Sequence, residues 1–281
     1  MKLVTFLHNN QERVGVKTDG DYYLLEDKTM IDLIRRCEHE GLPDLTNLKP
    51  ISGEITLFAP IPRPFRHIIC LGKNYEDHAK EVKETIQATQ DENLIPKNPI
   101  IFTKTAFPAP GDGAKIPLHE HLTKKPDYEA ELGVIIGKTI YCATREEVEG
   151  AIFGYTIIND LTARDIQVKH AQWFFGKSLD GFCPMGPHIV TRDEIPFPPA
   201  LDIKCRVNGE TRQSSNTSYL IFDIPYIISE LSQGITLHAG DIIATGTPAG
   251  IGHAMTPPQY LKRGDVVECE IEKIGVLTNY F

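Results

Sequence analysis

Acidic residues with a regular spacing stand at the start of a strongly apolar stretch. Glu129 and Glu131 are two residues apart and run directly into apolar residues 132–136. On a strand, side chains i and i+2 point to the same face, and two adjacent carboxylates are unfavourable unless a cation lies between them. Asp160 closes a second apolar run, residues 152–159, as a neighbouring strand would deliver it. Three converging carboxylates predict a site for a hard divalent cation, Mg²⁺ or Mn²⁺; the alternative is a solvated strand face.

A histidine and a glutamate form a second candidate pair. The sequence predicts a charged helix over residues 75–84, with Asn74 as its N-cap. His78 and Glu81 then lie at i and i+3 on one face of that helix. A carboxylate beside an imidazole fixes the tautomer of the ring and raises its basicity, as the removal of a proton from water requires. The alternative is an ordinary surface helix with a weak ion pair.

The overall composition is typical of a soluble protein of enzyme size. The chain has 281 residues and a formal net charge of -9, with a sequence pI near 5.6. This acidity argues against a surface for nucleic acid or anionic membranes, and no apolar run approaches the roughly 20 residues of a membrane span. No export signal is recognised, and the cysteines have no Cys-X-X-Cys spacing. We therefore expect reduced thiols and a cytoplasmic location.

Two units are predicted along the chain. Residues 1–60 contain short strand patterns and a helical pattern at residues 30–39, which indicate a small N-terminal α+β domain. Prolines at alternate positions within residues 59–64 indicate a linker. Residues 65–281 contain many apolar runs of strand length and few long helical patterns, the clearest at residues 224–231. We expect an α+β fold that is mainly β, with a few helices, rather than a doubly wound βαβ sheet.

Several motifs occur in order along the second unit. They are LGKNY at residues 71–75, DYEAELG at 127–133, NDLTARDIQ at 159–167, GKS at 176–178, VNGE at 207–210 and GDIIATGTP at 240–248. With these motifs, the chain from about Arg66 to its C-terminus resembles the fumarylacetoacetate hydrolase superfamily. Within it, the chain is similar to the group of acylpyruvases, oxaloacetate decarboxylases and hydroxyhepta-diene-dioate isomerases.

The resemblance implies a fold and a set of site residues. The implied fold is a mixed β-roll that pairs into homodimers, with a lid that holds the histidine and includes the polar residues 82–99. Members that act in tyrosine breakdown have a further metal carboxylate seven residues before the histidine, where this chain has Leu71, so we expect a site of three carboxylates. The implied residues are Glu129, Glu131 and Asp160 as metal ligands, His78 as general base, Glu81 to orient it, Lys177 as a catalytic cation, and Gln167, Arg164 and Thr247 as substrate contacts.

The resemblance also implies a reaction on a small-molecule oxo acid. A 2,4-dioxo acid, such as an acylpyruvate, would chelate the cation, and hydrolysis of the bond beyond C3 would leave an enolate whose charge the metal stabilises. Lys177, helped by Gln167, would donate to the attacked carbonyl oxygen, and His78 would deprotonate the water. Three alternatives stay open: decarboxylation of oxaloacetate, isomerisation of an unsaturated oxo diacid, and a metal-binding module that keeps the fold without turnover.

Overall fold

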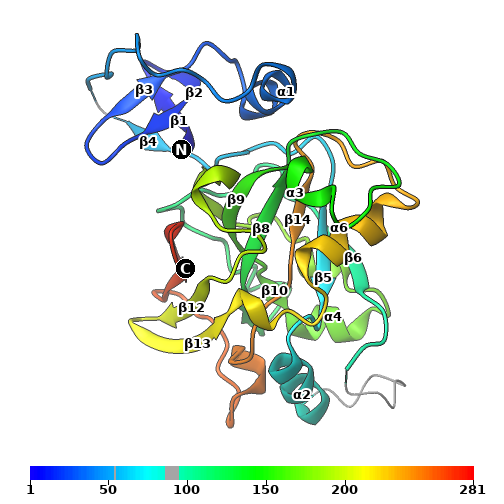
Figure 1. Ribbon diagram of the computed structural model, residues 1–281. Helices are drawn as coiled ribbons and strands as arrows, with labels where there is room; N and C mark the ends of the chain where they lie inside the picture. Colours follow the sequence, from blue (N-terminus) through cyan, green and yellow to red (C-terminus); the bar gives the residue numbers. More distant parts are fainter. Residues whose placement is uncertain (54, 86–94) are drawn as a thin grey trace.

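The protein consists of a small N-terminal unit and a larger body, as Figure 1 shows. The computed structural model describes residues 1–53, 55–85 and 95–281. The N-terminal unit, blue in Figure 1, lies at one end of the body. Residues 86–94, which belong to the predicted lid, lie outside the described residues.

The N-terminal unit is an antiparallel sheet with one helix. The helix begins after Thr29, whose side chain accepts a hydrogen bond from the N–H of Asp32, and the Asp32 carboxylate accepts one from the N–H of Thr29. This capping box satisfies N–H groups that the first turn leaves without intrahelical partners. The elements are β1 (Lys2–His8), β2 (Gln11–Lys17), β3 (Tyr22–Leu24), α1 (Met30–Glu40) and β4 (Thr56–Leu57).

One large sheet runs through both units. Its strand order is β3-β2-β1-β11-β9-β8-β14-β5-β6, and β4 joins it by pairing with β1. The pair β14 and β5 is parallel, whereas β8 is antiparallel to both of its neighbours. The pairing of Leu3 with Ile189 joins the N-terminal strands to the body, and a domain boundary between residues 60 and 65 stays a prediction. The strands of the body in this sheet are β5 (Ile68–Gly72), β6 (Ile100–Lys104), β8 (Ala130–Ile136), β9 (Ile152–Asn159), β11 (Met185–Thr191) and β14 (Ile242–Ala244).

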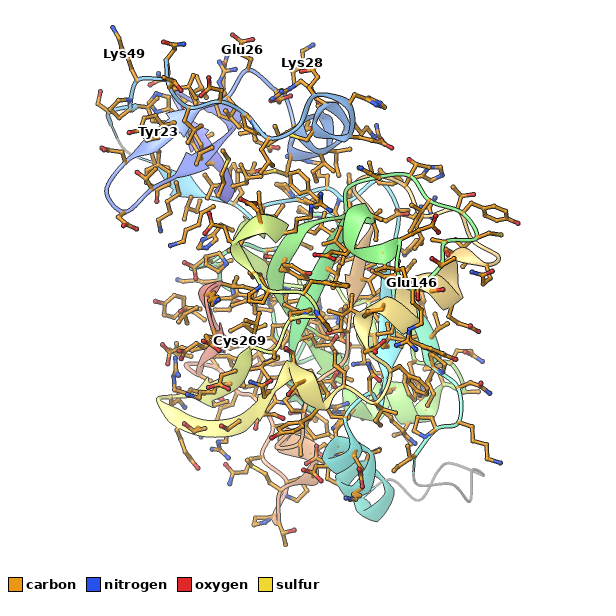
Figure 2. All side chains as sticks on the ribbon, in the orientation of Figure 1. Tyr23, Glu26, Lys28, Lys49, Glu146 and Cys269 are labelled. Atoms are coloured by element: carbon orange, nitrogen blue, oxygen red, sulfur yellow. The ribbon has the colours of Figure 1, made fainter. Side chains whose placement is uncertain are left out.

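A second sheet packs against the first. Its order is β13-β12-β15-β16, and β12 and β15 contact β8 and β9. Leu132 and Ile157 of the first sheet and Ile203 of the second belong to one buried core, and Cys269 of β15 lies within it (Figure 2). The strands are β12 (Asp202–Val207), β13 (Glu210–Asn216), β15 (Val266–Ile271) and β16 (Gly275–Tyr280), and a separate short pair is formed by β7 (Pro126–Asp127) and β10 (Thr162–Ala163).

The helices of the body are short. The clearest predicted helix, at residues 224–231, is confirmed, and Asp223 caps it by accepting a hydrogen bond from the N–H of Tyr226. In the described part of the chain, no helix has the length and apolarity needed to cross a membrane. The expectation of an α+β fold that is mainly β is confirmed. The helices are α2 (Glu76–Thr85), α3 (Val148–Ala151), α4 (Arg164–Lys169), α5 (Phe174–Lys177) and α6 (Ile224–Ser232), with 3₁₀ turns at Arg192–Glu194, Thr217–Tyr219 and Gly252–Ala254.

Candidate active site

The three predicted metal carboxylates come together at one end of β8 and β9. Glu129 precedes β8, Glu131 lies within it, and Asp160 directly follows β9. The two strands are paired, with Glu131 opposite Ile158, and the N–H of Asp160 donates a 2.8 Å hydrogen bond to the carbonyl oxygen of Glu129. Oxygen atoms of the three carboxylates lie within 4.8 Å of one another, and all three residues are buried. The structure therefore forms the acidic triad that the spacing predicts.

Three basic side chains contact this triad. Lys177 Nζ lies 2.7 Å from Glu129 Oε2 and 2.6 Å from Asp160 Oδ2. Arg164 Nη2 lies 2.7 Å from Glu129 Oε1. Lys104, fully buried at the end of β6, contacts the other oxygen of Asp160, Oδ1. Because an unpaired charge in the interior is costly, these contacts compensate the negative charges of Glu129 and Asp160.

The surroundings shift the pKa values of Glu129 and Glu131 in opposite directions. Burial favours the neutral form of Glu129, but Lys177 and Arg164 outweigh it and lower the pKa to about 2. For Glu131, burial and then the charges of the two other carboxylates raise the pKa well above its ordinary value. Glu131 Oε2 accepts a 2.9 Å hydrogen bond from the N–H of Gly246, yet none of the ion pairs among the described residues includes this carboxylate. Glu131 is where the triad lacks positive charge.

This set of donors fits a hard divalent cation. Mg²⁺ and Mn²⁺ prefer carboxylate oxygens, and the triad contains no histidine nitrogen or cysteine sulfur of the kind that zinc favours. A dication bound here would supply the positive charge that Glu131 lacks. Leu71 presents an apolar side chain to the same cavity, in line with the expectation of three carboxylates rather than four.

His78 and Glu81 form a hydrogen-bonded pair on α2. His78 Nδ1 lies 2.8 Å from Glu81 Oε1, and Glu81 Oε2 accepts a 2.9 Å hydrogen bond from the N–H of Gly250. Because an ionised carboxylate can only accept, we assign the Nδ1 proton to the histidine, which leaves Nε2 with a lone pair. His78 is only 5% exposed and lines the cavity beside the triad. The ring is thus oriented as a base would need to be.

Asn74 does not cap α2, contrary to the prediction. The helix begins at Glu76, so the cap position falls on Tyr75. The buried amide of Asn74 instead donates to the carbonyl oxygens of Phe222 and Thr245 and accepts from the N–H of Phe222. These bonds tie the end of β5 to two distant segments, so tertiary contacts fix the start of α2.

One cavity brings the candidate groups together. Its volume is about 140 Å³. Glu81 and Asp160 do not line it but contact residues that do, namely His78 and Lys177. The aromatic part of the wall comes from Phe102 and Trp173, whose rings meet edge to face with centroids 5.4 Å apart. The predicted site residues on the wall are His78, Glu129, Glu131, Arg164, Gln167, Lys177 and Thr247.

The predicted substrate contacts are held by buried neighbours. Arg164 Nε donates a 2.8 Å hydrogen bond to Asp127 Oδ2, and its Nη1 donates one of 3.2 Å to Gln167 Oε1. Thr247 Oγ1 accepts a 2.7 Å hydrogen bond from Gln213 Nε2. Side chains fixed in this way are preorganised for binding because little rotamer freedom is left to lose.

Sequence reasoning missed Lys104, Asp127 and Gln213. Lys104 comes shortly after the apolar residues 100–102, and its one sequence signal is this position at the end of an apolar run, which Asp160 also has. Asp127 opens the acidic motif, but its bond to Arg164 joins positions 37 residues apart. Gln213 lies on a strand that the sequence does not predict. Such contacts leave no local pattern to detect.

The chain is similar over most of its length to several known proteins. It is 49% identical over 227 residues to an oxaloacetate tautomerase, YisK, of Bacillus subtilis, a match that covers 81% of this chain and 73% of that protein. A solved fumarylacetoacetate hydrolase of Exiguobacterium antarcticum is 43% identical, with a TM-score of 0.87 and coverage of 100% of this chain and 98% of that chain. A solved maleylpyruvate hydrolase of Sphingobium, in complex with manganese(II) and pyruvate, is 30% identical, with a TM-score of 0.77 and full coverage of both chains.

These similarities bear on the cofactor and on the family. The expectation of a divalent-metal site is confirmed by the buried triad together with a solved relative that holds manganese(II). A model of the fumarylacetoacetate (FAA) hydrolase C-terminal family matches residues 67–281, which include every predicted site residue. The chain therefore belongs to the fumarylacetoacetate hydrolase family.

Proposed function

We propose that the protein is a divalent-metal-dependent enzyme that moves a proton at the carbon beside the oxo group of a short 2-oxo diacid, interconverting its keto and enol forms. One observation carries the proposal: the His78–Glu81 pair and the acidic triad meet at one small cavity. Enolisation of a 2-oxo acid needs a base at C3 and an electrophile at the oxo oxygen, and this cavity offers a place for both.

The electrophilic side of the cavity combines the triad with Lys177. A divalent cation held by Glu129, Glu131 and Asp160 supplies a Lewis acid for negative charge on the oxo oxygen. Burial lowers the pKa of Lys177, but Asp160 and Glu129 outweigh it and raise the pKa above its ordinary value. Lys177 therefore stays charged at neutral pH and can donate a hydrogen bond to the same oxygen as its charge develops.

His78 is the group that moves the proton. Nε2 takes the proton from C3, the C–H electron pair becomes the C2–C3 double bond, and the carbonyl π pair moves to the oxo oxygen. The Glu81 carboxylate, 2.8 Å from Nδ1, stabilises the imidazolium that forms. Return of the proton to C3 gives the keto acid, and protonation of the oxygen gives the enol.

The size of the cavity supports a short substrate. Its volume of about 140 Å³ is close to that of an engineered cavity of about 150 Å³ that binds benzene. An acid of four carbons fits within this space. The relative of 49% identity is an oxaloacetate tautomerase, and oxaloacetate is a 2-oxo diacid of four carbons, so we place this reaction first.

Carbon–carbon hydrolysis of a 2,4-dioxo acid, the reaction expected from the sequence, is the second candidate. The observation that favours it is the similarity, over all of this chain, to two solved hydrolases that are named for dioxo acids, fumarylacetoacetate and maleylpyruvate, the second of which is a 2,4-dioxo acid. In that reaction His78 would deprotonate a water, and Lys177 would donate to the attacked carbonyl oxygen. The intact His78–Glu81 pair argues against a metal-binding module without turnover.

Enol absorbance of oxaloacetate and of a short acylpyruvate, with Mg²⁺ or Mn²⁺ and after chelation, tests the proposal. We expect metal-dependent decay of the oxaloacetate enol. His78→Ala should slow it by about two to four orders of magnitude, with metal affinity in calorimetry unchanged. His121→Ala, which alters an exposed histidine outside the cavity, is the matched control and should retain the wild-type rate.

Two outcomes would refute the proposal. One is a rate that persists after chelation, and the other is a wild-type rate in His78→Ala. Faster loss of the acylpyruvate than of the oxaloacetate enol would favour the second candidate.

A further inference from the structure

A further cationic side chain lines the cavity. Lys73 is half-buried on its wall, at the turn between β5 and α2. The proposed proton transfer gives tasks to His78 and Lys177 and leaves Lys73 without one. Lys73 lines the same cavity as His78 and Lys177, so it can contact a molecule bound there.

The backbone holds Lys73 in an unusual conformation. Its φ is 53°, in the left-handed region that residues with a β-carbon rarely adopt. Both neighbours are fixed, because Gly72 pairs with Ile100 in the sheet and buried Asn74 bonds to Phe222 from its side-chain amide. Strain held in place by a rigid surround is typical of functional positions.

The turn that carries Lys73 packs against the backbone group that binds a metal carboxylate. Gly246 approaches it so closely that a β-carbon there would lie 2.8 Å from Asn74 Cβ and 3.2 Å from the carbonyl oxygen of Leu71. The N–H of the same glycine donates to Glu131 Oε2 at 2.9 Å. Gly246 thus contacts both this turn and a carboxylate of the triad. The flexible four-carbon stem of a lysine can reach a small molecule bound there.

An aromatic wall stands beside Lys73. Trp173 covers Gly72, where a β-carbon would lie 2.5 Å from the indole ring, and Phe102 packs edge to face on Trp173. Because these rings exclude water from one side, an ion pair formed at Lys73 would be stronger than one in open solvent.

We propose that Lys73 binds the second carboxylate of the substrate, so that the site selects 2-oxo diacids over 2-oxo acids with an uncharged tail. This assignment rests on the proposed function. When the 2-oxo acid end lies at the triad, the far carboxylate of a four-carbon chain is drawn out of water, and a desolvated carboxylate needs a charged partner. Lys73 supplies that partner from a turn that is already rigid, which keeps the entropic cost of binding small.

The test compares two substrates that differ only at C4. Oxaloacetate has a carboxylate there, and 2-oxobutanoate has a methyl group. Deuterium exchange at C3, followed by proton NMR with Mg²⁺ and corrected for the rate with metal alone, reports the same step for both. The variants are Lys73→Met and Lys73→Arg. The matched control is Lys273→Met, which alters an exposed lysine that has the same left-handed backbone, with a φ of 63°, and lies outside the cavity.

We expect Lys73→Met to lower kcat/KM for oxaloacetate by about tenfold to a hundredfold, mainly through KM, as the loss of a charged hydrogen bond would. Its rate with 2-oxobutanoate should stay close to wild type, Lys73→Arg should keep part of the preference, and Lys273→Met should match wild type. Equal losses on both substrates would overturn the assignment. If the wild-type protein exchanges neither substrate, the proposed function itself is wrong and the assignment falls with it.

Discussion

Glu129 and Glu131 have the same side chain, but their surroundings shift their pKa values in opposite directions. Glu129 is stabilised as an anion by Lys177 and Arg164, which lower its pKa to about 2. Burial and two neighbouring negative charges raise the pKa of Glu131, so the metal-free fold favours its neutral form. The same change, glutamate to glutamine, should therefore have different effects at the two positions.

Glu131→Gln should abolish measurable Mg²⁺ and Mn²⁺ binding and leave the metal-free protein at least as stable as wild type. The first effect follows because the cation loses an anionic ligand. The second follows because a group whose folded pKa is raised stabilises the fold below its unfolded pKa and loses that contribution as the pH rises through the folded value. Glutamine keeps the neutral form at every pH. Calorimetry and urea denaturation measure the two effects.

Glu129→Gln is the matched control, with the opposite sign for stability. A carboxylate with a lowered pKa stabilises the fold above its unfolded pKa, and that contribution is lost as the pH falls toward the folded value, here about 2. At neutral pH the variant leaves Lys177 and Arg164 short of a partner, so the free energy of unfolding should fall by about 3 to 5 kcal/mol. Equal stability of the two variants would contradict this electrostatic account.

At the scale of elements, the pairing of β8 with β9 assembles the triad. A slip of one residue in the register would move Glu131 to the opposite face of the sheet. Both strands are buried throughout, which is why unbroken apolar runs predict them from the sequence. By contrast, β13 and β16 are only partly buried, and their polar residues hide the strand pattern.

The contacts that complete the site join residues that lie far apart in the sequence. Lys104 meets Asp160 across 56 residues of sequence, and Asn74 reaches Thr245 across 171. The two glutamates, and the histidine with Glu81, could be predicted because two nearby positions in the sequence carry the signal. Lys104 could not, because a buried lysine is recognised only once its partner is placed, and the N-cap prediction for Asn74 was wrong for the same reason.

Asn74→Ala should loosen the junction between β5 and α2 without unfolding the body. The change removes three hydrogen bonds to buried or half-buried partners, at a cost of about 1 to 3 kcal/mol. We expect faster hydrogen exchange at residues 75–82 and a lower rate, because His78 depends on this junction for its position. Gln172→Ala, which alters an exposed side chain, should leave exchange unchanged; accelerated exchange across the whole sheet would instead indicate general destabilisation.

At the scale of the whole molecule, the sheet continues from the N-terminal unit into the body. The sequence predicts both units from their patterns, but the pairing of β1 with β11 joins residues about 190 positions apart and has no local signature. The site lies where β5, β8, β9 and α2 meet, so the body provides every described site residue. The N-terminal unit provides none of the residues that line the cavity.

Removal of the metal should leave the whole protein folded. Lys177, Arg164 and Lys104 already pair with two of the three carboxylates, so the metal-free triad is not an uncompensated anion cluster. We expect an unchanged circular dichroism spectrum after chelation. The gain in unfolding free energy on adding metal should follow ligand linkage, about 2.7 kcal/mol at a hundred times Kd. Glu131→Gln should show no gain, and unfolding of wild type by chelator alone would contradict the prediction.

Because Lys177, Arg164 and Lys104 already pair with carboxylates of the triad, we expect the protein to fold without a bound metal. In a zinc finger the ion and the fold arrive together, and the ion bound at folding is the ion retained. We expect this polypeptide to reach its folded shape before it binds a cation, so the bound ion should exchange with the hard dications that the surroundings supply. The fraction of metal-loaded molecules should therefore follow the free concentration of that ion, and the proposed activity should rise and fall with metal supply without any new synthesis or loss of protein.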